Sequence, residues 1–313
     1  MTRRPAPDAR QYGKVFDEVA DEYDRNRPMY PDELIDHACQ VAGIGAGDRV
    51  LEIGCGTGQL TRSLLARGLH VTAVEPGQNL LALARQNLAG AGTAGTTGTA
   101  GTTGTKGTAE FMNARFEDAA CPHEHFRAVF SASALHWVDP EVSWRKIADV
   151  LVPGGTLALI SYLGLQEERS KLDQEAVLAA LGRIAPDLAA HWPAYRDLDT
   201  MLAGVKQRRE NVSEVWSWLG SYDLARDYVG RLFGDVQVAA AAPKLIEQTA
   251  DELNAVLRTM SFHARLSPEQ RQALERENAA IYERLGRPIR ASTVTILITA
   301  QRRMSAGHGL DVE

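Results

Sequence analysis

The sequence has little of several features that define common protein classes. Its 313 residues include three cysteines, Cys39, Cys55 and Cys121, and no two of them form a Cys-x-x-Cys pair. This spacing argues against a structural zinc site and is typical of reduced thiols in the cytoplasm. We therefore expect a cytoplasmic protein with no bound metal.

Positive charge is not in excess either. Lys and Arg number 34 against 40 Asp and Glu, so the formal net charge is −6. Nucleic acids and anionic membranes attract basic proteins, and neither is an expected partner here. No apolar h-region follows the arginines of the first ten residues, which argues against a secretory signal. The longest apolar stretch, near residues 150–165, is interrupted by Pro153 and two glycines and is too broken to span a bilayer.

What the chain does have is a regular alternation of strand and helix patterns up to about residue 162. This alternation predicts a mostly parallel sheet with helices on both faces. The strands are expected at residues 49–53, 71–75, 110–114, 126–131 and 156–162. With 44% hydrophobic residues, the chain can bury a sizeable core. We expect a disordered tail at residues 1–10 and a single domain over residues 11–313.

The second half of the chain is mainly helical. We expect a helical cap formed by residues 166–230 and 244–290, with strands at 234–240 and 292–300. Two capping boxes support the second part of this cap, one pairing Thr249 with Glu252 and the other pairing Ser267 with Gln270.

Residues 90–108 are an interruption of a different kind. From Gly92 onward the segment repeats Gly-Thr-X triplets and has no apolar side chain larger than alanine. This composition predicts a flexible, solvated insertion between a helix and the next strand, with no chemical role.

The most informative feature is the segment 50–58, Val-Leu-Glu-Ile-Gly-Cys-Gly-Thr-Gly. It predicts a strand that runs into Gly54, Gly56 and Gly58 and then opens a helix, so that a ligand can approach the backbone closely. Dinucleotide motifs place their third glycine at the position of Gln59, and a Walker loop would continue with Gly-Lys-Ser/Thr. These departures disfavour the alternative of an NAD(P)-dependent oxidoreductase.

Two glutamates flank this glycine turn. Glu52 precedes it, where a carboxylate would repel a pyrophosphate but suits a ligand that carries an ammonium group. Glu75 ends the second strand, in the position from which an acidic residue accepts hydrogen bonds from a ribose diol. S-adenosylmethionine has an α-amino group, a sulfonium, a ribose diol and no phosphate. The two glutamates therefore favour S-adenosylmethionine as the cofactor.

The turn with its glutamates resembles motif I of the class I S-adenosylmethionine-dependent methyltransferases. Residues 16–31, with Phe-Asp-x-x-Ala-x-x-Tyr-Asp and then Arg-Pro-x-Tyr-Pro, resemble the N-terminal lid of a small-molecule subgroup similar to trans-aconitate methyltransferases. The segments 115–118 and 133–137 resemble that subgroup after its third and fourth strands. The resemblance covers a cofactor-binding core at about residues 12–163. It implies an α/β fold with a Rossmann-like seven-stranded sheet, mostly parallel, whose last strand is antiparallel.

The resemblance also implies how the cofactor is held. Glu52 and the three glycines would surround its methionine part, and Glu75 would hold its ribose. Arg27 would pair with the cofactor carboxylate, and Tyr23 would close over it.

The adenine ring would meet a separate group of residues. Leu80 would pack on its face, while Phe116, through its backbone N–H, and Glu117, through its carboxylate, would read its edge. Many relatives have an Asp where this chain has Arg115, so either Glu117 or Asp118 is expected at the adenine amino group.

His136 follows the fourth strand, where methyl acceptors meet the sulfonium. It is expected to act either as a general base for an acceptor hydroxyl or as a residue that shapes the pocket. The implied reaction is in-line methyl transfer to an oxygen, carboxylate or hydroxyl, of a small molecule, and a carboxylate acceptor needs no base. The other alternative is a non-catalytic methyltransferase-like binding protein. The acceptor's identity and the oligomeric state are not indicated.

Overall fold

The protein is described by a computed structural model over residues 15–89, 107–193 and 195–304. The strands are β1 (Arg49–Ile53), β2 (His70–Val74), β3 (Thr108–Met112), β4 (Phe126–Ala132), β5 (Leu151–Leu165), β6 (Phe233–Ala240), β7 (Lys244–Gln248) and β8 (Ile289–Arg302). The helices are α2 (Ala20–Asn26), α3 (Asp32–Ala42), α4 (Gln59–Ala66), α5 (Gln78–Asn87), η1 (Leu135–Trp137), α6 (Pro140–Val150), α7 (Glu168–Ile184), α8 (Pro186–Ala189), α9 (Leu198–Lys206), α10 (Val212–Gly220), α11 (Val229–Leu232), α12 (Ala250–Arg258), α13 (Ser261–Ala264) and α14 (Pro268–Leu285). The predicted tail at 1–10 and residues 90–106 of the predicted insertion lie outside the described residues.

The strands form one mixed sheet in the order β3-β2-β1-β4-β5-β8-β6, with β7 also paired to β8. The pairs from β3 to β5 are parallel, and β8 runs antiparallel to β5 and β6. This confirms the predicted Rossmann-like arrangement with an antiparallel last strand. Because β1 and β4 are neighbours and parallel, their carboxyl ends meet at one edge of the sheet, which is where ligands bind in such folds.

The sheet has eight strands in place of the predicted seven. The additional strand, β7, occupies residues that we predicted to be part of the helical cap. The physical reason is the length of β8, which begins at Ile289 and so extends beyond the start that we predicted. Its first residues offer a strand edge, and β7 pairs with it antiparallel from Lys244 opposite Thr293 to Gln248 opposite Ile289.

Two apolar cores cover opposite faces of the sheet. Along β1, Val50 belongs to the core shared with α3, α4 and α5, while Leu51 and Ile53 belong to the core shared with α6, α9 and α10. This alternation is the strand period of two, and it leaves both faces of the central strands buried. The glycine turn at the end of β1 therefore stands on a rigid, fully packed support.

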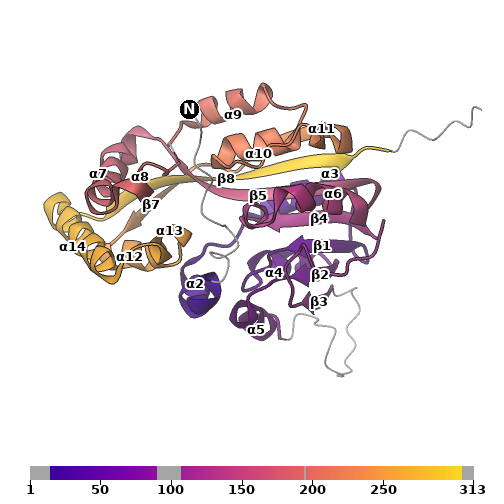
Figure 1. Cartoon of the computed structure of the whole chain (residues 1–313), viewed down its shortest axis with the longest axis horizontal. Coiled ribbons are helices and arrows are strands. Elements are labelled where there is room, and N and C mark those ends of the chain that lie inside the picture. The colour runs from indigo at the N-terminus through magenta and orange to yellow at the C-terminus, as the bar shows by residue number, and fades with distance from the viewer. Residues whose placement is uncertain (1–14, 90–106, 194, 305–313) are drawn as a thin grey trace, which may run out of the picture.

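Of the segments predicted as the cap, α7, α12, α13 and α14 lie at the other end of the molecule from β1, β2 and β3, whereas α9, α10 and α11 pack on the sheet (Figure 1). Helices α7, α12 and α14 pack there around a third apolar core, and both predicted capping boxes are present at the starts of α12 and α14. Helix α2 lies between the cap and the sheet and contacts both α12 and α5 (Figure 1). The N-terminal segment thus bridges the two parts of the molecule.

Candidate functional site

The glycine turn between β1 and α4 forms the floor of the candidate site. Gly54, Gly56 and Gly58 all adopt positive φ, at 73°, 55° and 91°. A Cβ atom on Gly54 would lie 2.3 Å from the Cβ of Ala134, which comes from the segment after β4. Only glycine therefore fits at position 54, because a side chain there would be strained by its backbone and blocked by its neighbour.

Glu52 lies in β1 directly before this turn and is 1% exposed. One oxygen of its carboxylate accepts a hydrogen bond of 2.6 Å from the Thr61 hydroxyl in α4. Burial raises the pKa of Glu52 to about 7, against the opposing effect of Thr61 and with a contribution from the negative charge of Glu75. A cation brought near Glu52 would restore its charged form, so the site is suited to an ammonium group.

Glu75 follows β2, the parallel neighbour of β1, and points back at the turn. Its carboxylate accepts backbone hydrogen bonds from Gly56 N at 3.1 Å and from Gly77 N at 2.8 Å. Burial raises the pKa of Glu75, and these two bonds oppose that shift. A carboxylate has about four acceptor positions, so two remain for the hydroxyls of a ligand. We call Glu52, the glycine turn and Glu75 the carboxylate side of the site.

The N-terminal segment covers the carboxylate side. The Tyr23 ring reaches the turn, since a Cβ on Gly56 would lie 3.7 Å from its Cε1 atom. The guanidinium of Arg27 lies 5.1 Å from the Tyr23 ring centroid and donates a 2.7 Å hydrogen bond to the carbonyl of Thr259 in the cap. The structure thus brings Tyr23 to the turn, and Arg27 links Tyr23 to the cap.

The same segment is tied to both ends of α5. The Asp17 carboxylate accepts hydrogen bonds from Asn79 N at 2.6 Å and Leu80 N at 3.0 Å, which caps the helix start. At the helix end, the Asn87 amide donates to Asp24 at 2.8 Å. Neither aspartate was predicted to be an anchor, although both stand inside the motif at residues 16–31.

Of the predicted adenine residues, Leu80 lies beside Gly77, close to Glu75. Leu80 is 3% exposed and would lie 2.9 Å from a Cβ on Gly77, while Phe116 is buried. The Glu117 carboxylate contacts Arg115 at 2.7 Å and accepts from Asp139 N at 3.1 Å. Burial alone would raise the pKa of Glu117, but these bonds lower it. Glu117 is therefore a carboxylate held in place, whereas Asp118 is exposed.

His136 lies in η1, which follows β4. Glu75 follows β2, and β2 and β4 flank β1 on its two sides. Its ring stacks on that of Tyr222, with centroids 4.5 Å apart and planes at 7°, and it also touches Trp137. Burial, together with the positive charge of Arg27, lowers the pKa of His136 to about 3. The imidazole is consequently neutral at pH 7 and a weak base, which favours the pocket-shaping interpretation over the general base.

Two further tyrosines, Tyr30 and Tyr162, lie close enough to Arg27 to be affected by its charge, as His136 is. Burial raises the pKa of Tyr30, which bonds to Ser133, and the charge of Arg27 opposes this rise. Burial also raises the pKa of Tyr162, whose hydroxyl accepts a 2.9 Å bond from Thr293, and Arg27 again opposes it. We call the set of Tyr30, His136, Trp137, Tyr162 and Tyr222 the aromatic side of the site. No sequence motif pointed to Tyr162 or Tyr222.

Four buried polar atoms at or near the turn have no hydrogen-bond partner among the described residues. They are Thr57 Oγ1 in the turn, Gln59 Nε2 directly after it, His136 Nδ1 on the aromatic side, and Arg27 Nε. Buried polar groups are rarely left unpaired, because each costs free energy unless a ligand or water satisfies it. Their grouping at the turn fits a polar ligand bound between the N-terminal segment and β1.

Comparison with known proteins shows that part of the chain is similar to methyltransferases. Residues 51–159 match the family model described as a methyltransferase domain. An uncharacterized methyltransferase of Mycobacterium tuberculosis is 37% identical over 149 residues, which is 46% of this chain and 51% of that protein. A demethylmenaquinone methyltransferase of Clavibacter sepedonicus is 28% identical over 49% of this chain and 58% of its own length. The chain thus spans about half the length of the curated relatives that it matches.

A solved structure supports the fold over a larger part of the chain. A candidate type II methyltransferase from Anaeromyxobacter dehalogenans aligns with 89% of this chain and 99% of its own, at 20% identity and a TM-score of 0.50. In the parts of the chain that the structure describes, no helix is both long enough and apolar enough for a membrane crossing.

Proposed function

We propose that the whole chain transfers a methyl group from S-adenosylmethionine to an oxygen of a small molecule. The match of residues 51–159 to a methyltransferase domain supports this proposal. When bound, this cofactor supplies a methyl group on a positively charged sulfur. The protein's task is then to hold both partners in line and to keep water away. The observation that carries the proposal is the contrast between the two sides of the site around Arg27.

The carboxylate side fits the cofactor. Glu52 would meet its α-amino group and Glu75 its ribose diol, while Arg27, whose Nε is buried without a partner in the described chain, would pair with its carboxylate. Tyr23 would cover the methionine part. Leu80, Phe116 and Glu117 would hold the adenine. In this arrangement the α-amino group and the carboxylate of the ligand each meet a residue of opposite charge.

The aromatic side fits an acidic oxygen. Arg27 is assigned to the cofactor carboxylate, so its charge does not select the acceptor. His136, whose pKa is lowered to about 3, is too weak a base to deprotonate a neutral alcohol. We therefore favour a carboxylate over a hydroxyl as the acceptor, because a carboxylate is already ionised at pH 7.

Labelled cofactor tests this function directly. We would incubate the protein with S-adenosylmethionine carrying a deuterated methyl group and a panel of small carboxylic acids, phenols and alcohols, and score products by mass gain of one labelled methyl. We expect gain on carboxylic acids and none on alcohols. Cofactor binding without any product would favour the non-catalytic alternative. Binding of NADH with no binding of S-adenosylmethionine would overturn the proposal.

One rival acceptor needs its own arm in this screen. Two relatives are named as quinone-pathway enzymes, the demethylmenaquinone methyltransferase already described and a ubiquinone/menaquinone C-methyltransferase of Pseudomonas fluorescens. The aromatic side would suit a quinol ring as well as a small acid. A demethylated menaquinol analogue that gains a methyl group on carbon would replace the oxygen acceptor in our proposal.

A further inference from the structure

Tyr222 is the fourth of five aromatic rings that contact one another in a row. The row runs from Phe16 in the N-terminal segment through Trp137, His136 and Tyr222 to Trp216 in α10, with successive centroids 5.5, 4.8, 4.5 and 5.7 Å apart. Within the row, only the pair of His136 and Tyr222 is parallel, at 7°. One face of the imidazole is therefore covered by the parallel ring of Tyr222.

The Tyr222 ring is itself held in a fixed position. A Cβ on Gly220 would lie 1.9 Å from its Cε2 atom, so the ring packs directly against the backbone at the end of α10. Its hydroxyl forms a hydrogen bond with Ser161 in β5, and burial raises its pKa to about 12. The ring is thus anchored at its edge and at its tip.

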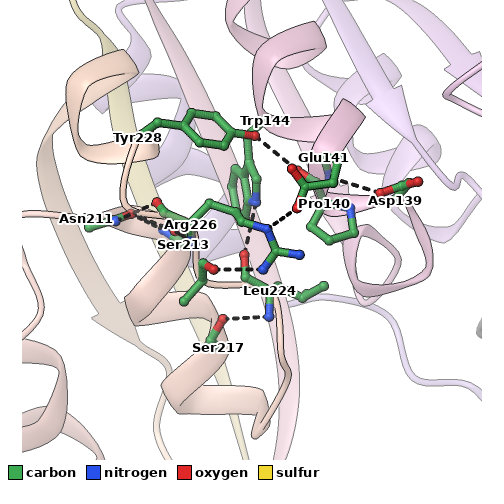
Figure 2. Close-up of polar contacts among 11 residues, drawn as sticks. Asp139, Pro140, Glu141, Trp144, Asn211, Ser213, Ser217, Leu224, Arg226 and Tyr228 are labelled. Atoms are coloured by element: carbon green, nitrogen blue, oxygen red, sulfur yellow. Dashed lines mark hydrogen bonds and ion pairs between the residues drawn. The ribbon is translucent and has the colours of Figure 1, made fainter. Parts of the chain in front are cut away.

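The segment that carries Tyr222, residues 221–228, is also held by contacts that follow Tyr222, at Leu224, Arg226 and Tyr228 (Figure 2). Two residues after Tyr222, Leu224 N donates to the Ser217 hydroxyl and Leu224 O accepts from Trp144 Nε1 in α6, both at 3.2 Å.

Further along the same segment, Arg226 forms an ion pair with Glu141, and the Tyr228 hydroxyl donates to Pro140 O at 3.2 Å (Figure 2). The backbone of Arg226 is bonded to Ser213 and Asn211 as well. Such a network leaves the segment little freedom to shift the Tyr222 ring.

From this geometry we propose that Tyr222 is the positioning residue of the aromatic side, which fixes the His136 ring and so the surface that the methyl acceptor meets. The inference rests on the proposed function. Nδ1 of His136 is buried and lacks a partner among the residues described, so the orientation of the ring decides which hydrogen bond an acceptor can form. The side chains that Tyr222 contacts here, those of His136, Trp216 and Ser161, are not among the residues that we assign to the cofactor, so Tyr222 can adapt the site to an acceptor.

The wild-type protein provides the first test. The ring of Tyr222 should shift the His136 ring-proton NMR resonances upfield, and His136 should stay neutral in a titration down to about pH 4, as Arg27 and burial demand. The resonances are assigned by their loss in His136→Asn. His136 resonances at the positions of an exposed histidine would overturn the proposal with no variant of Tyr222 needed.

Substitutions of Tyr222 provide the second test. Tyr222→Leu should abolish the upfield shift and raise the measured pKa of His136 by two units or more, because water then reaches the imidazole. Tyr222→Phe keeps the ring and should preserve both signals. Tyr282→Leu, a matched change in α14, outside the segment that carries Tyr222, should leave both signals unchanged. If Tyr222→Leu folds and leaves the shift and the pKa as in the wild type, the proposal is wrong; if it does not fold, the wild type and Tyr222→Phe decide.

Binding and turnover separate this inference from the proposed function. The affinity for S-adenosylmethionine should stay within about twofold in all three variants, and with an acceptor from the screen Tyr222→Leu should raise the acceptor KM about tenfold. Neither NMR signal depends on methyl transfer. An empty acceptor screen would therefore count against the proposed function alone, and a missing ring stack against Tyr222 alone.

Discussion

The carboxylate side and the aromatic side of the site differ in charge and in how they are assembled. The carboxylate side presents Glu52 and Glu75 from the ends of two adjacent parallel strands, within 24 residues of sequence. The aromatic side is neutral apart from Arg27 beside it, and its rings come from segments as distant as Tyr30 and Tyr222. Residues that are close in sequence keep their arrangement when distant segments change. A site whose residues come from distant segments can be altered by a change in any one of those segments.

This difference explains how one fold can keep its cofactor while its acceptor varies. The glycine turn and the glutamates depend on the register of β1 with β2, in which Gly54 N donates to Val74 O at 2.8 Å. Tyr162 lies in the part of β5 that extends beyond the core strands, and Tyr222 follows α10. We infer that changes in these later elements select the acceptor. The predictions that follow test whether the two sides are separable.

The largest effect is expected at the floor of the carboxylate side. Gly54→Ala should lower the free energy of unfolding by about 2–5 kcal/mol, from a left-handed backbone conformation costing about 1–2 kcal/mol and an overpacked contact costing about 1–3 kcal/mol. The contact is the one with the Ala134 Cβ at 2.3 Å. Thermal and urea unfolding measure the loss, and calorimetry should detect no binding of S-adenosylmethionine.

Gly43→Ala is the matched control for this change. Gly43 has φ 60° at the end of α3, but a Cβ atom there would meet nothing within 4 Å, so only the backbone strain of about 1 kcal/mol should appear. Its cofactor affinity should equal that of the wild type. Equal losses of stability in the two variants would show that the contact with the Ala134 Cβ does not contribute to the cost of Gly54→Ala.

A smaller effect is expected at the ribose ligand. Glu75→Ala should weaken binding of S-adenosylmethionine by about 1–3 kcal/mol, because charge-assisted hydrogen bonds are lost. Titration calorimetry measures the change, with Glu110→Ala, an exposed glutamate on neighbouring β3, as the control. Unchanged affinity in Glu75→Ala would remove this residue from the site.

The smallest effect concerns pH and Glu52. With its pKa raised to about 7, Glu52 is mostly protonated at pH 6 and mostly charged at pH 8. An ammonium ligand favours the charged form, so the dissociation constant for S-adenosylmethionine should fall about tenfold from pH 6 to pH 8. Glu52→Gln should bind more weakly and lose most of this dependence. A dependence that persists in Glu52→Gln would assign it to another group.

The same shift has the opposite sign for the stability of the cofactor-free protein. The folded state holds the Glu52 proton up to about pH 7, while the unfolded chain releases it near the ordinary value of 4.5. The unfolded state therefore binds fewer protons in this window, and the contribution of Glu52 to stability falls as pH rises from about 4.5 to 7. Bound S-adenosylmethionine should reduce this loss.

Sequence patterns were informative where the determinants are local. The β1 strand, the turn glycines and the capping boxes of α12 and α14 each depend on residues within a few positions of one another, and the structure confirms them. Strand β7 was missed because its formation depends on the unusual length of β8, more than 40 residues away.

The same distinction applies to the site. Asp17 caps α5 across 62 residues, and Tyr222 meets His136 from the segment that follows α10. Neither contact leaves a periodic signal in the sequence, because each is made only once the sheet has brought the segments together. The pKa of His136 likewise depends on Arg27, whose position is set by Thr259 in the cap.

The most direct test of this account is the affinity for S-adenosylmethionine measured by calorimetry in the wild type, Glu75→Ala and Tyr222→Leu. We predict that Glu75→Ala weakens binding by at least about fivefold, in line with the loss of about 1 kcal/mol or more, while Tyr222→Leu stays within about twofold of the wild type. Equal weakening in both variants, or no weakening in Glu75→Ala, would contradict the separation of a carboxylate side for the cofactor from an aromatic side for the acceptor.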